Sequence, residues 1–267
     1  LDVTLSAVIK NRSTPLNRNI DITLISGSRP DLLDRMLCSF LEAVPNLSIF
    51  KNVYVNIDPF FGDRTAQKEC SVIIKNFFEN AFILMPKESS FGSAVKNVWS
   101  KCAQNVTLHL EDDWVFEDHI NLDSIKIFDN EPGLGSLKFA TKNHENFNAA
   151  SLEIVSSPRR RKEMNICGLR IIMPYTVNSF GTSPRLIRGG LAQKLSAKID
   201  PNLDPEKQIY RGVNWPLCKL QEQYKEKILF SKKGKRLITD IGRQWQRENR
   251  IKKINRGAGV WWEKLEG

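Results

Sequence analysis

The first half of the chain alternates between short strand-like segments and amphipathic helix-like segments, and this alternation restricts the fold more than any other feature. The strand-like segments are 22–27, 52–58, 81–86 and 106–113, and the helix-like segments between them are 31–44, 65–81 and 92–103. Strands that alternate with helices form a mostly parallel sheet that is covered on both faces. The sequence therefore predicts an α/β fold with a mostly parallel sheet flanked by helices.

The second half is less regular and predicts a smaller lobe that completes the same domain. Its expected elements are a strand within 136–148, a strand and then a helix beginning near Pro184 within 165–195, helices at both ends of 204–224, and two short strands joined by a basic turn within 227–242. No Pro-, Gly- or Ser-rich linker interrupts the 267 residues. We therefore expect one domain over 1–267, with its halves at about 20–120 and about 121–267.

Polar residues follow three of the four predicted strands at their carboxyl ends. Ser26–Arg29 follow the first strand, Asp58 ends the second, and Glu111, Asp112 and Asp113 end the fourth. In an open parallel α/β sheet, ligands bind in the crevice beyond the carboxyl ends of the strands. Three adjacent carboxylates repel one another, and a bound hard cation would relieve that repulsion. A metal site and a solvated acidic turn are the two interpretations of the triplet.

With these segments in place, the chain resembles the GT-A class of nucleotide-sugar-dependent glycosyltransferases, and most closely its large inverting family 2. The resemblance lies in "DITLISGSRPDLLDRMLCSFL", "VNID", "ESSFGSAVKNVWSKC" and "LHLEDDW", between residues 21 and 116. These are similar to the opening strand and helix, the strand that ends in the base-binding aspartate, the segment that lines the diphosphate, and the metal-binding acidic motif. The acidic motif is EDD instead of DxD, and beyond residue 120 the resemblance is weak.

The resemblance implies a metal-dependent transfer of a sugar, with inversion, from a nucleoside-diphosphate sugar that we expect to be UDP-linked. Mn²⁺ or Mg²⁺ would stabilise the negative charge that develops on the departing diphosphate. Asp113 is the expected direct ligand, while Asp112 would face the ribose and Glu111 would brace the turn; all three are candidates for the metal site.

The resemblance also assigns contacts to the nucleotide. The expected residues at the end of the first strand are Ser26, Gly27, Ser28 and Arg29, and Asp58 would accept a hydrogen bond from a uracil-type base. "VNIDPFFGD" lacks the small polar residues usual after this aspartate, which leaves the identity of the base open. Arg29 could instead cap the helix or pair with a neighbouring aspartate, and Asp58 could be a turn residue.

Three further residues are expected near the diphosphate. Gly92 would let the backbone approach it, and Lys96 would supply a point charge. Arg243 belongs to a basic C-terminal segment that would fold over the diphosphate and exclude water. The structural alternatives are that Gly92 starts a helix and that the basic segment is a solvated helix.

An inverting transfer also needs a general base for the acceptor hydroxyl. The segment "NLDPEKQI" supplies Glu206 as the first candidate and Asp204 as the second. Acidic residues are also favoured at helix N-termini by the helix dipole, which is the structural alternative for both.

The charge supports a second class of function. The formal net charge of +10 suggests an anionic partner. The alternatives are therefore a nucleic-acid-binding protein or a metal-dependent nuclease or nucleotidyltransferase, and a transferase with an anionic, glycan, DNA or lipid-phosphate acceptor would be basic too.

The cysteines and the hydropathy indicate the cellular setting. Five widely spaced cysteines without a CxxC motif favour reduced, mostly buried thiols. No apolar run is long enough to cross a bilayer, and no secretory signal pattern opens the sequence. We expect a cytoplasmic protein, with peripheral attachment to a membrane as the alternative.

Overall fold

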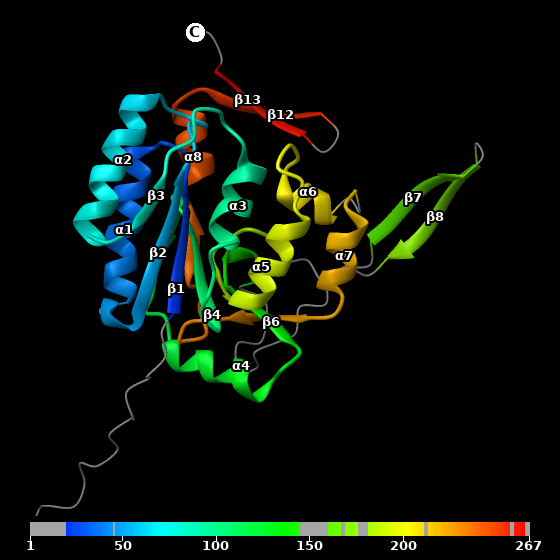
Figure 1. Ribbon diagram of the computed structural model, residues 1–267, viewed down its shortest axis with the longest axis horizontal. Helices are drawn as coiled ribbons and strands as arrows, with labels where there is room; N and C mark the ends of the chain where they lie inside the picture. The colour runs from blue at the N-terminus through cyan, green and yellow to red at the C-terminus, as the bar shows by residue number, and fades with distance from the viewer. Residues whose placement is uncertain are drawn as a thin grey trace, which may run out of the picture.

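The structure, a computed structural model, describes residues 20–44, 46–144, 160–166, 169–175, 181–210, 213–256 and 259–264. Its helices are α1 (Pro30–Ala43), α2 (Arg64–Phe77), α3 (Phe91–Trp99), α4 (Ile127–Asn130), α5 (Gly189–Lys198), α6 (Pro205–Tyr210), α7 (Trp215–Gln221) and α8 (Gly242–Glu248). Its strands are β1 (Ile20–Ser26), β2 (Phe50–Ile57), β3 (Phe82–Leu84), β4 (Val106–Glu111), β5 (Trp114–Phe116), β6 (Leu134–Phe139), β7 (Arg160–Ile166), β8 (Leu169–Tyr175), β9 (Arg185–Arg188), β10 (Lys225–Leu229), β11 (Ile238–Asp240), β12 (Ile251–Arg256) and β13 (Gly259–Lys264). Figure 1 shows this arrangement.

The centre of the molecule is a seven-stranded sheet in the order β10-β6-β9-β4-β1-β2-β3. Strand β1 is parallel to its neighbours β2 and β4, β2 is parallel to β3, and β6 is parallel to β10. Strand β9 runs antiparallel to both β4 and β6. The prediction of an α/β fold with a mostly parallel sheet flanked by helices is confirmed.

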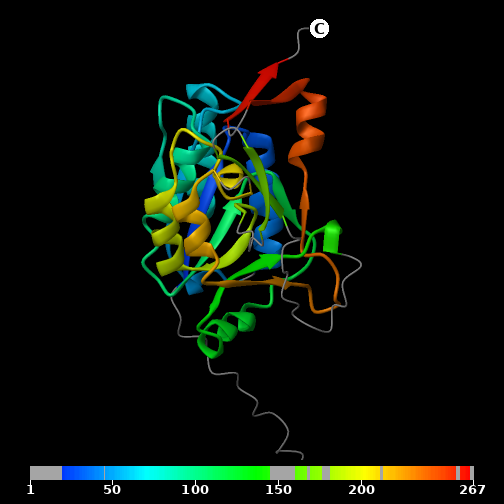
Figure 2. The same ribbon diagram turned by 90° about the vertical axis from the view of Figure 1, so that its right-hand side faces the viewer.

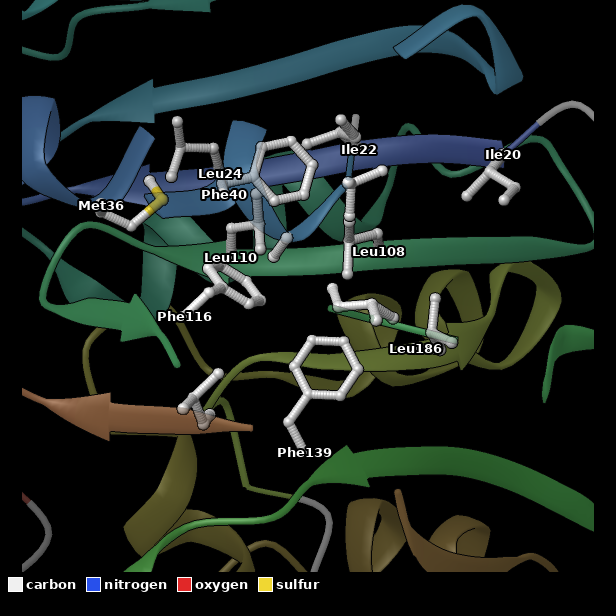
Figure 3. Close-up of a cluster of buried hydrophobic side chains, with 14 of the residues drawn as sticks. Ile20, Ile22, Leu24, Met36, Phe40, Leu108, Leu110, Phe116, Phe139 and Leu186 are labelled. Carbon is white, nitrogen blue, oxygen red and sulfur yellow. The ribbon is translucent and has the colours of Figure 1, made fainter. Parts of the chain in front are cut away.

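Strand alternation explains why helices cover both faces of the sheet. Ile22 and Leu24 of β1 pack with α1 in one core, whereas Ile25 belongs to a second core with α3, α5 and α7. Figure 3 shows the first core, in which Phe40 of α1 lies against the apolar side chains of β1 and β4 and near Phe116. Coverage of both faces accounts for the burial of all seven residues of β1, including the polar Asp21 and Thr23.

Two expectations for the second half are corrected. The helix predicted to begin near Pro184 begins at Gly189, because Arg185–Arg188 form the antiparallel strand β9 inside the sheet. The two strands within 227–242 exist, but the basic turn does not join them as a hairpin. Strand β10 pairs with β6, and β11 pairs with β5 in a separate two-stranded sheet.

His109 is the clearest case of a polar residue that the sheet uses structurally. It is fully buried in β4, and its Nδ1 lies 2.9 Å from Thr23 Oγ1 and accepts the indole N–H of Trp99 at 3.1 Å. An indole nitrogen only donates, so the proton of the neutral imidazole must be on Nε2. Burial lowers the pKa of His109 to about 3, and the charge of Arg185 adds to this effect.

We expect His109 to make folding pH-dependent. Its folded pKa lies below the unfolded value of 6.5, so the unfolded chain binds the proton more tightly and stability falls as the pH drops below 6.5. The expected loss between pH 8 and pH 5 is about 2 kcal/mol. Urea unfolding of His109→Asn, which keeps an acceptor for Trp99 but cannot titrate, should show a flatter pH dependence. Replacement of the exposed His119 should leave the dependence unchanged, and equal slopes for His109→Asn and the wild type would contradict this assignment.

In the described part of the chain, no helix is long and apolar enough to cross a membrane. Cys70, Cys102 and Cys218 are buried, Cys38 is exposed, and no disulfide joins these four cysteines.

Candidate active site

A cavity of about 850 Å³ opens beyond the carboxyl ends of β1, β2 and β4. Its walls include the residues that follow these three strands, the loop before α6, and side chains of the C-terminal segment α8-β12-β13. Figures 1 and 2 show that segment at the opposite end of the molecule from α4. The structure therefore brings the three predicted polar clusters to one edge of the sheet.

Asp112 organises the turn after β1 and has little capacity left for a ligand. It is 1% exposed, and one carboxylate oxygen accepts from Ser26 Oγ at 2.9 Å and from the Gly27 amide at 2.8 Å. The other oxygen forms an ion pair with Arg29. Burial raises the pKa of Asp112, and Arg29 opposes the rise. Asp112 was predicted to bind the metal or the ribose. In the structure its carboxylate instead connects the end of β4 to the turn after β1, through Ser26, Gly27 and Arg29.

Arg29 is a buried cation with unused hydrogen-bond donors. Its guanidinium pairs with Asp112 and lies 3.1 Å from Asp113, with Phe61 at 4.6 Å and Trp245 at 5.5 Å from its carbon. Burial alone would lower the pKa of Arg29, but the two aspartates raise it above its ordinary value. Nε and Nη1 are buried and have no acceptor among the described residues. Such orphaned donors at a cavity wall call for an anionic or carbonyl oxygen.

Asp113 and its neighbours form an acidic side of the cavity. The Asp113 side chain is 22% exposed, and a Cβ on Gly242 would overlap its carboxylate. Burial, and then the charges of Asp113 and Glu206, raise the pKa of Glu111 well above its ordinary range. Burial and Asp113 also raise the pKa of Asp240. Burial is the larger cause of both shifts, and the repulsion between the carboxylates, the smaller cause, is what a bound cation would relieve.

The acidic wall fits a cation that takes only part of its coordination from the protein. Among the described residues, no group of three or more His, Cys, Asp or Glu side chains is close enough to hold a metal ion. Mg²⁺ sites in nucleotide enzymes commonly use one or two carboxylates, with phosphate and water oxygens as the remaining ligands. Asp113 can supply such a carboxylate, whereas Asp112 is engaged by Arg29 and Glu111 Oε2 accepts from Trp114 Nε1 at 3.1 Å.

Asp58 also lines the cavity, and it too is held by the protein. It is 3% exposed, and its carboxylate accepts from Ser89 Oγ at 2.6 Å and from the Ser90 amide at 2.9 Å. Burial raises its pKa. Ser28 has a left-handed backbone with φ of 59° and donates its hydroxyl to the Asp58 carbonyl at 2.7 Å. The turns after β1 and β2 are thereby locked together.

Gly92 and Lys96 have protein partners in the structure. A Cβ on Gly92 would lie 2.6 Å from the carbonyl oxygens of Pro201 and Leu203, so this glycine permits α3 to approach the 200–203 loop. Lys96 Nζ donates to the Ile199 carbonyl at 3.1 Å, and Lys96 is not among the residues that line the cavity. Gly92 is among them.

The two candidate bases have different surroundings. Asp204 accepts from the Lys207 amide at 3.1 Å, as a residue at the start of α6 would, and burial raises its pKa. Both residues line the cavity, and Glu206 Oε1 accepts from both the amide and the hydroxyl of Thr182 at 3.1 and 3.3 Å.

The C-terminal segment closes one side of the cavity through aromatic contacts that the sequence reasoning missed. Trp262 packs edge-on against Phe61, with ring centres 5.2 Å apart, and Lys253 Nζ lies 5.1 Å from the Trp262 ring. Trp245 of α8 also packs on Phe61 at 5.5 Å. Arg243 lines the cavity, is 85% exposed and pairs with Asp240 at 3.2 Å. The paired Phe60 and Phe61 after a polar turn are the sequence signal that could have indicated these contacts.

No known protein-family model matches the chain, and no curated protein matches its sequence. Solved structures do match. Staphylococcus aureus TarS aligns with 82% of the chain at a TM-score of 0.50 and 13% identity, over 36% of its own length. S. aureus TarS 1–349 in complex with UDP aligns with 82% at 0.51 and 13%, over 59% of its length.

A third solved structure is mannosyltransferase PcManGT from Pyrobaculum calidifontis in complex with GDP-Man and Mn²⁺. It aligns with 80% of the chain at a TM-score of 0.53 and 9% identity, over 58% of its own length. The chain therefore spans between about one third and three fifths of these proteins. The likeness shows that the chain has a GT-A-like fold.

Proposed function

We propose that this protein is a metal-dependent glycosyltransferase that moves a sugar from a nucleoside-diphosphate sugar, UDP-linked, to an anionic or glycan acceptor with inversion. The observation that carries the proposal is the cavity beyond the strand ends, where a buried Arg29 with two unused donors lies beside an acidic wall. Solved structures that share the fold are complexes with UDP and with GDP-Man and Mn²⁺, which supports the choice of donor class and cofactor.

The donor would occupy the half of the cavity formed by residues up to about 120. Arg29 would direct Nε and Nη1 at a donor oxygen, while the amide and hydroxyl groups of Ser26, Gly27 and Ser28 keep the turn in place. Asp58 would meet the base through the cavity wall that it shares with Phe60 and Phe61. Bound Mn²⁺ or Mg²⁺ would supply Lewis-acid stabilisation of the leaving diphosphate.

Asp113 would hold that cation, because its side chain is 22% exposed, whereas Asp112 is enclosed by Ser26, Gly27 and Arg29 and Glu111 Oε2 accepts from Trp114. Arg29 at 3.1 Å would keep the Asp113 carboxylate oriented. Arg243 and Lys253 line the same cavity and would add positive charge near the phosphates when the C-terminal segment covers the donor.

The acceptor would enter from the side formed by residues beyond about 121. Glu206 would take the proton of the acceptor hydroxyl, because it lines the cavity and one of its oxygens is fixed by Thr182. Asp204 would remain the second candidate, with its helix-capping bond to Lys207 as the competing role.

Nucleic-acid binding is the second candidate function, and one observation favours it. Exposed cations of α8, β12 and the turn between them include Arg243, Arg247, Arg250, Lys252 and Lys253. Such a surface suits phosphate groups. The phosphates could belong to a nucleic acid that the protein binds, or to a strand that it cleaves or extends as a metal-dependent nuclease or nucleotidyltransferase. They could also belong to the DNA or lipid-phosphate acceptor of a transferase. The acidic cavity wall argues for a catalytic role beneath that surface.

Thermal unfolding with UDP, GDP, CMP and dTDP, each with and without Mn²⁺, tests the proposal. A nucleotide at 100 times its dissociation constant should add about 2.7 kcal/mol of stability, which raises Tm by several degrees in a chain of this size. We expect the largest shift with UDP and Mn²⁺ together. The absence of a shift with every nucleotide, combined with tight salt-dependent binding of an oligonucleotide, would favour the second function.

A further inference from the structure

A chain of buried polar contacts runs through the sheet and ends beside the cavity. Ser136 of β6 donates to Glu226 of β10 at 2.8 Å, and Arg185 of β9 donates Nη1 to the same Glu226 oxygen at 2.6 Å. Arg185 then donates Nε to the Ser183 carbonyl at 2.8 Å and Nη2 to the Ser183 hydroxyl at 3.0 Å. All three strand residues are buried, and Arg185 is 0% exposed.

Thr182 continues this chain into the cavity. It is 2% exposed, and both its amide and its hydroxyl donate to Oε1 of Glu206. Because both donors meet one oxygen, the carboxylate is fixed through Oε1 while Oε2 has no hydrogen bond to Thr182. The side chains of Thr182, Ser183 and Glu206 all belong to the cavity wall.

We infer that Thr182 is a positioning residue for Glu206, and that the buried Arg185–Glu226 pair acts on Glu206 through the Thr182–Ser183 turn. The inference rests on the proposed function, in which Glu206 takes the acceptor proton. A general base must lie within hydrogen-bond reach of the proton it removes, so its orientation matters as much as its presence.

The energetics of the Arg185–Glu226 pair agree with a positioning role. A fully buried ion pair is weak evidence for stability, because desolvation of both charges offsets much of their attraction. The contribution of this pair is to orient the Thr182–Ser183 turn, because the planar guanidinium of Arg185 donates to two Ser183 oxygens at once. Arg188, on the same strand, bonds instead to the main-chain carbonyls of Leu134 and Glu131 and serves as the matched control.

The test is the hydrolysis of UDP-glucose, UDP-N-acetylglucosamine and GDP-mannose by the intact chain with Mn²⁺, in which water replaces the unidentified acceptor. Thr182→Val keeps the shape and the amide but loses the hydroxyl donor, and should lower kcat about 10-fold. The donor KM and the UDP-induced rise in Tm should not change. Thr182→Ser should restore kcat, and Thr141→Val, which removes a buried hydroxyl beside His144 outside the cavity, should have no effect.

The arginine variants test the more distant half of the inference. Arg185→Lys keeps a cation beside Glu226 but cannot hold both Ser183 oxygens, and should lower kcat with an unchanged donor KM, whereas Arg188→Lys should leave both constants unchanged. An unchanged kcat in Thr182→Val, or a fall in kcat accompanied by an equal loss of donor binding, would overturn the positioning role. If the wild type hydrolyses no donor of the panel although it binds a nucleotide, the proposed function fails, and the inference with it.

Discussion

Asp113→Asn is expected to abolish the metal-dependent part of nucleotide binding and to lower sugar transfer or donor hydrolysis by about 100-fold or more. The reason is that a cation on the leaving phosphates would supply several kcal/mol of transition-state stabilisation, and the partly exposed Asp113 is its proposed ligand. Folding should be nearly unaffected, because asparagine has the same shape and the Asp113 main-chain carbonyl still accepts from the Ile241 amide at 2.8 Å. Donor hydrolysis with and without EDTA, and Tm with UDP and Mn²⁺, measure both effects.

Asp112→Asn is the matched control, because it changes the adjacent residue in the same way. Asp112 is buried against Arg29, Ser26 and Gly27, so its replacement should reduce stability while a response to Mn²⁺ remains in the folded fraction. Full activity of Asp113→Asn in the presence of EDTA would exclude the metal role of Asp113. Loss of the Mn²⁺ response in Asp112→Asn and its retention in Asp113→Asn would transfer that role to Asp112.

The first half of the fold could be predicted from sequence because its signals are local. Helix α1 has apolar residues on one face and Pro30 in its first turn, and β1 is a short segment rich in Ile and Leu that ends at polar residues. These patterns place Ser26, Asp58 and Asp113 at strand ends, and the rule for parallel sheets then gathers them at one edge. No long-range information was needed for that step.

The second half needed contacts between distant residues. The segment Arg185–Arg188 is too short to show a strand pattern in the sequence. It forms a strand because β4 and β6 hydrogen-bond to it from both sides. The role of Thr182 beside Glu206 depends on a 24-residue separation that no local pattern encodes. Similarly, the contacts of Trp245 and Trp262 with Phe61 appear only when the C-terminal segment is placed against the turn after β2.

The same limit applies to the charged residues. The order of the polar clusters along the chain indicated where a cation and a nucleotide would lie. It could not show which carboxylates accept hydrogen bonds from the protein itself and are therefore not free to bind a ligand. Asp112 and Asp58 are both held by internal donors, and Lys96 is bonded to a main-chain carbonyl. Burial and hydrogen bonding of these groups are properties of the assembled turns, not of the residue types.

Arg29→Met is expected to destabilise the protein by about 3–5 kcal/mol at neutral pH, the usual cost of leaving one partner of a buried ion pair uncompensated. Arg29 is 4% exposed and Asp112 is 1% exposed, so water cannot replace the lost contact. Arg35→Met, at an exposed position of the helix α1 that follows Arg29, should change stability by less than about 0.5 kcal/mol. Urea unfolding of both variants measures the difference, and equal stabilities at pH 7 would contradict the assignment.

The pH dependence of the Arg29→Met deficit identifies its source. Burial raises the pKa of Asp112 and Arg29 opposes the rise, so without Arg29 the folded pKa moves further above the unfolded value of 3.8. The folded state then binds the proton more tightly, and stability is lost as pH rises above about 4. The deficit should therefore be smallest in acid and grow towards neutral pH. Arg29→Met combined with Asp112→Asn should recover part of the loss at pH 7, since the charge that required Arg29 is absent, and strict additivity of the two single losses would show that the residues are not coupled.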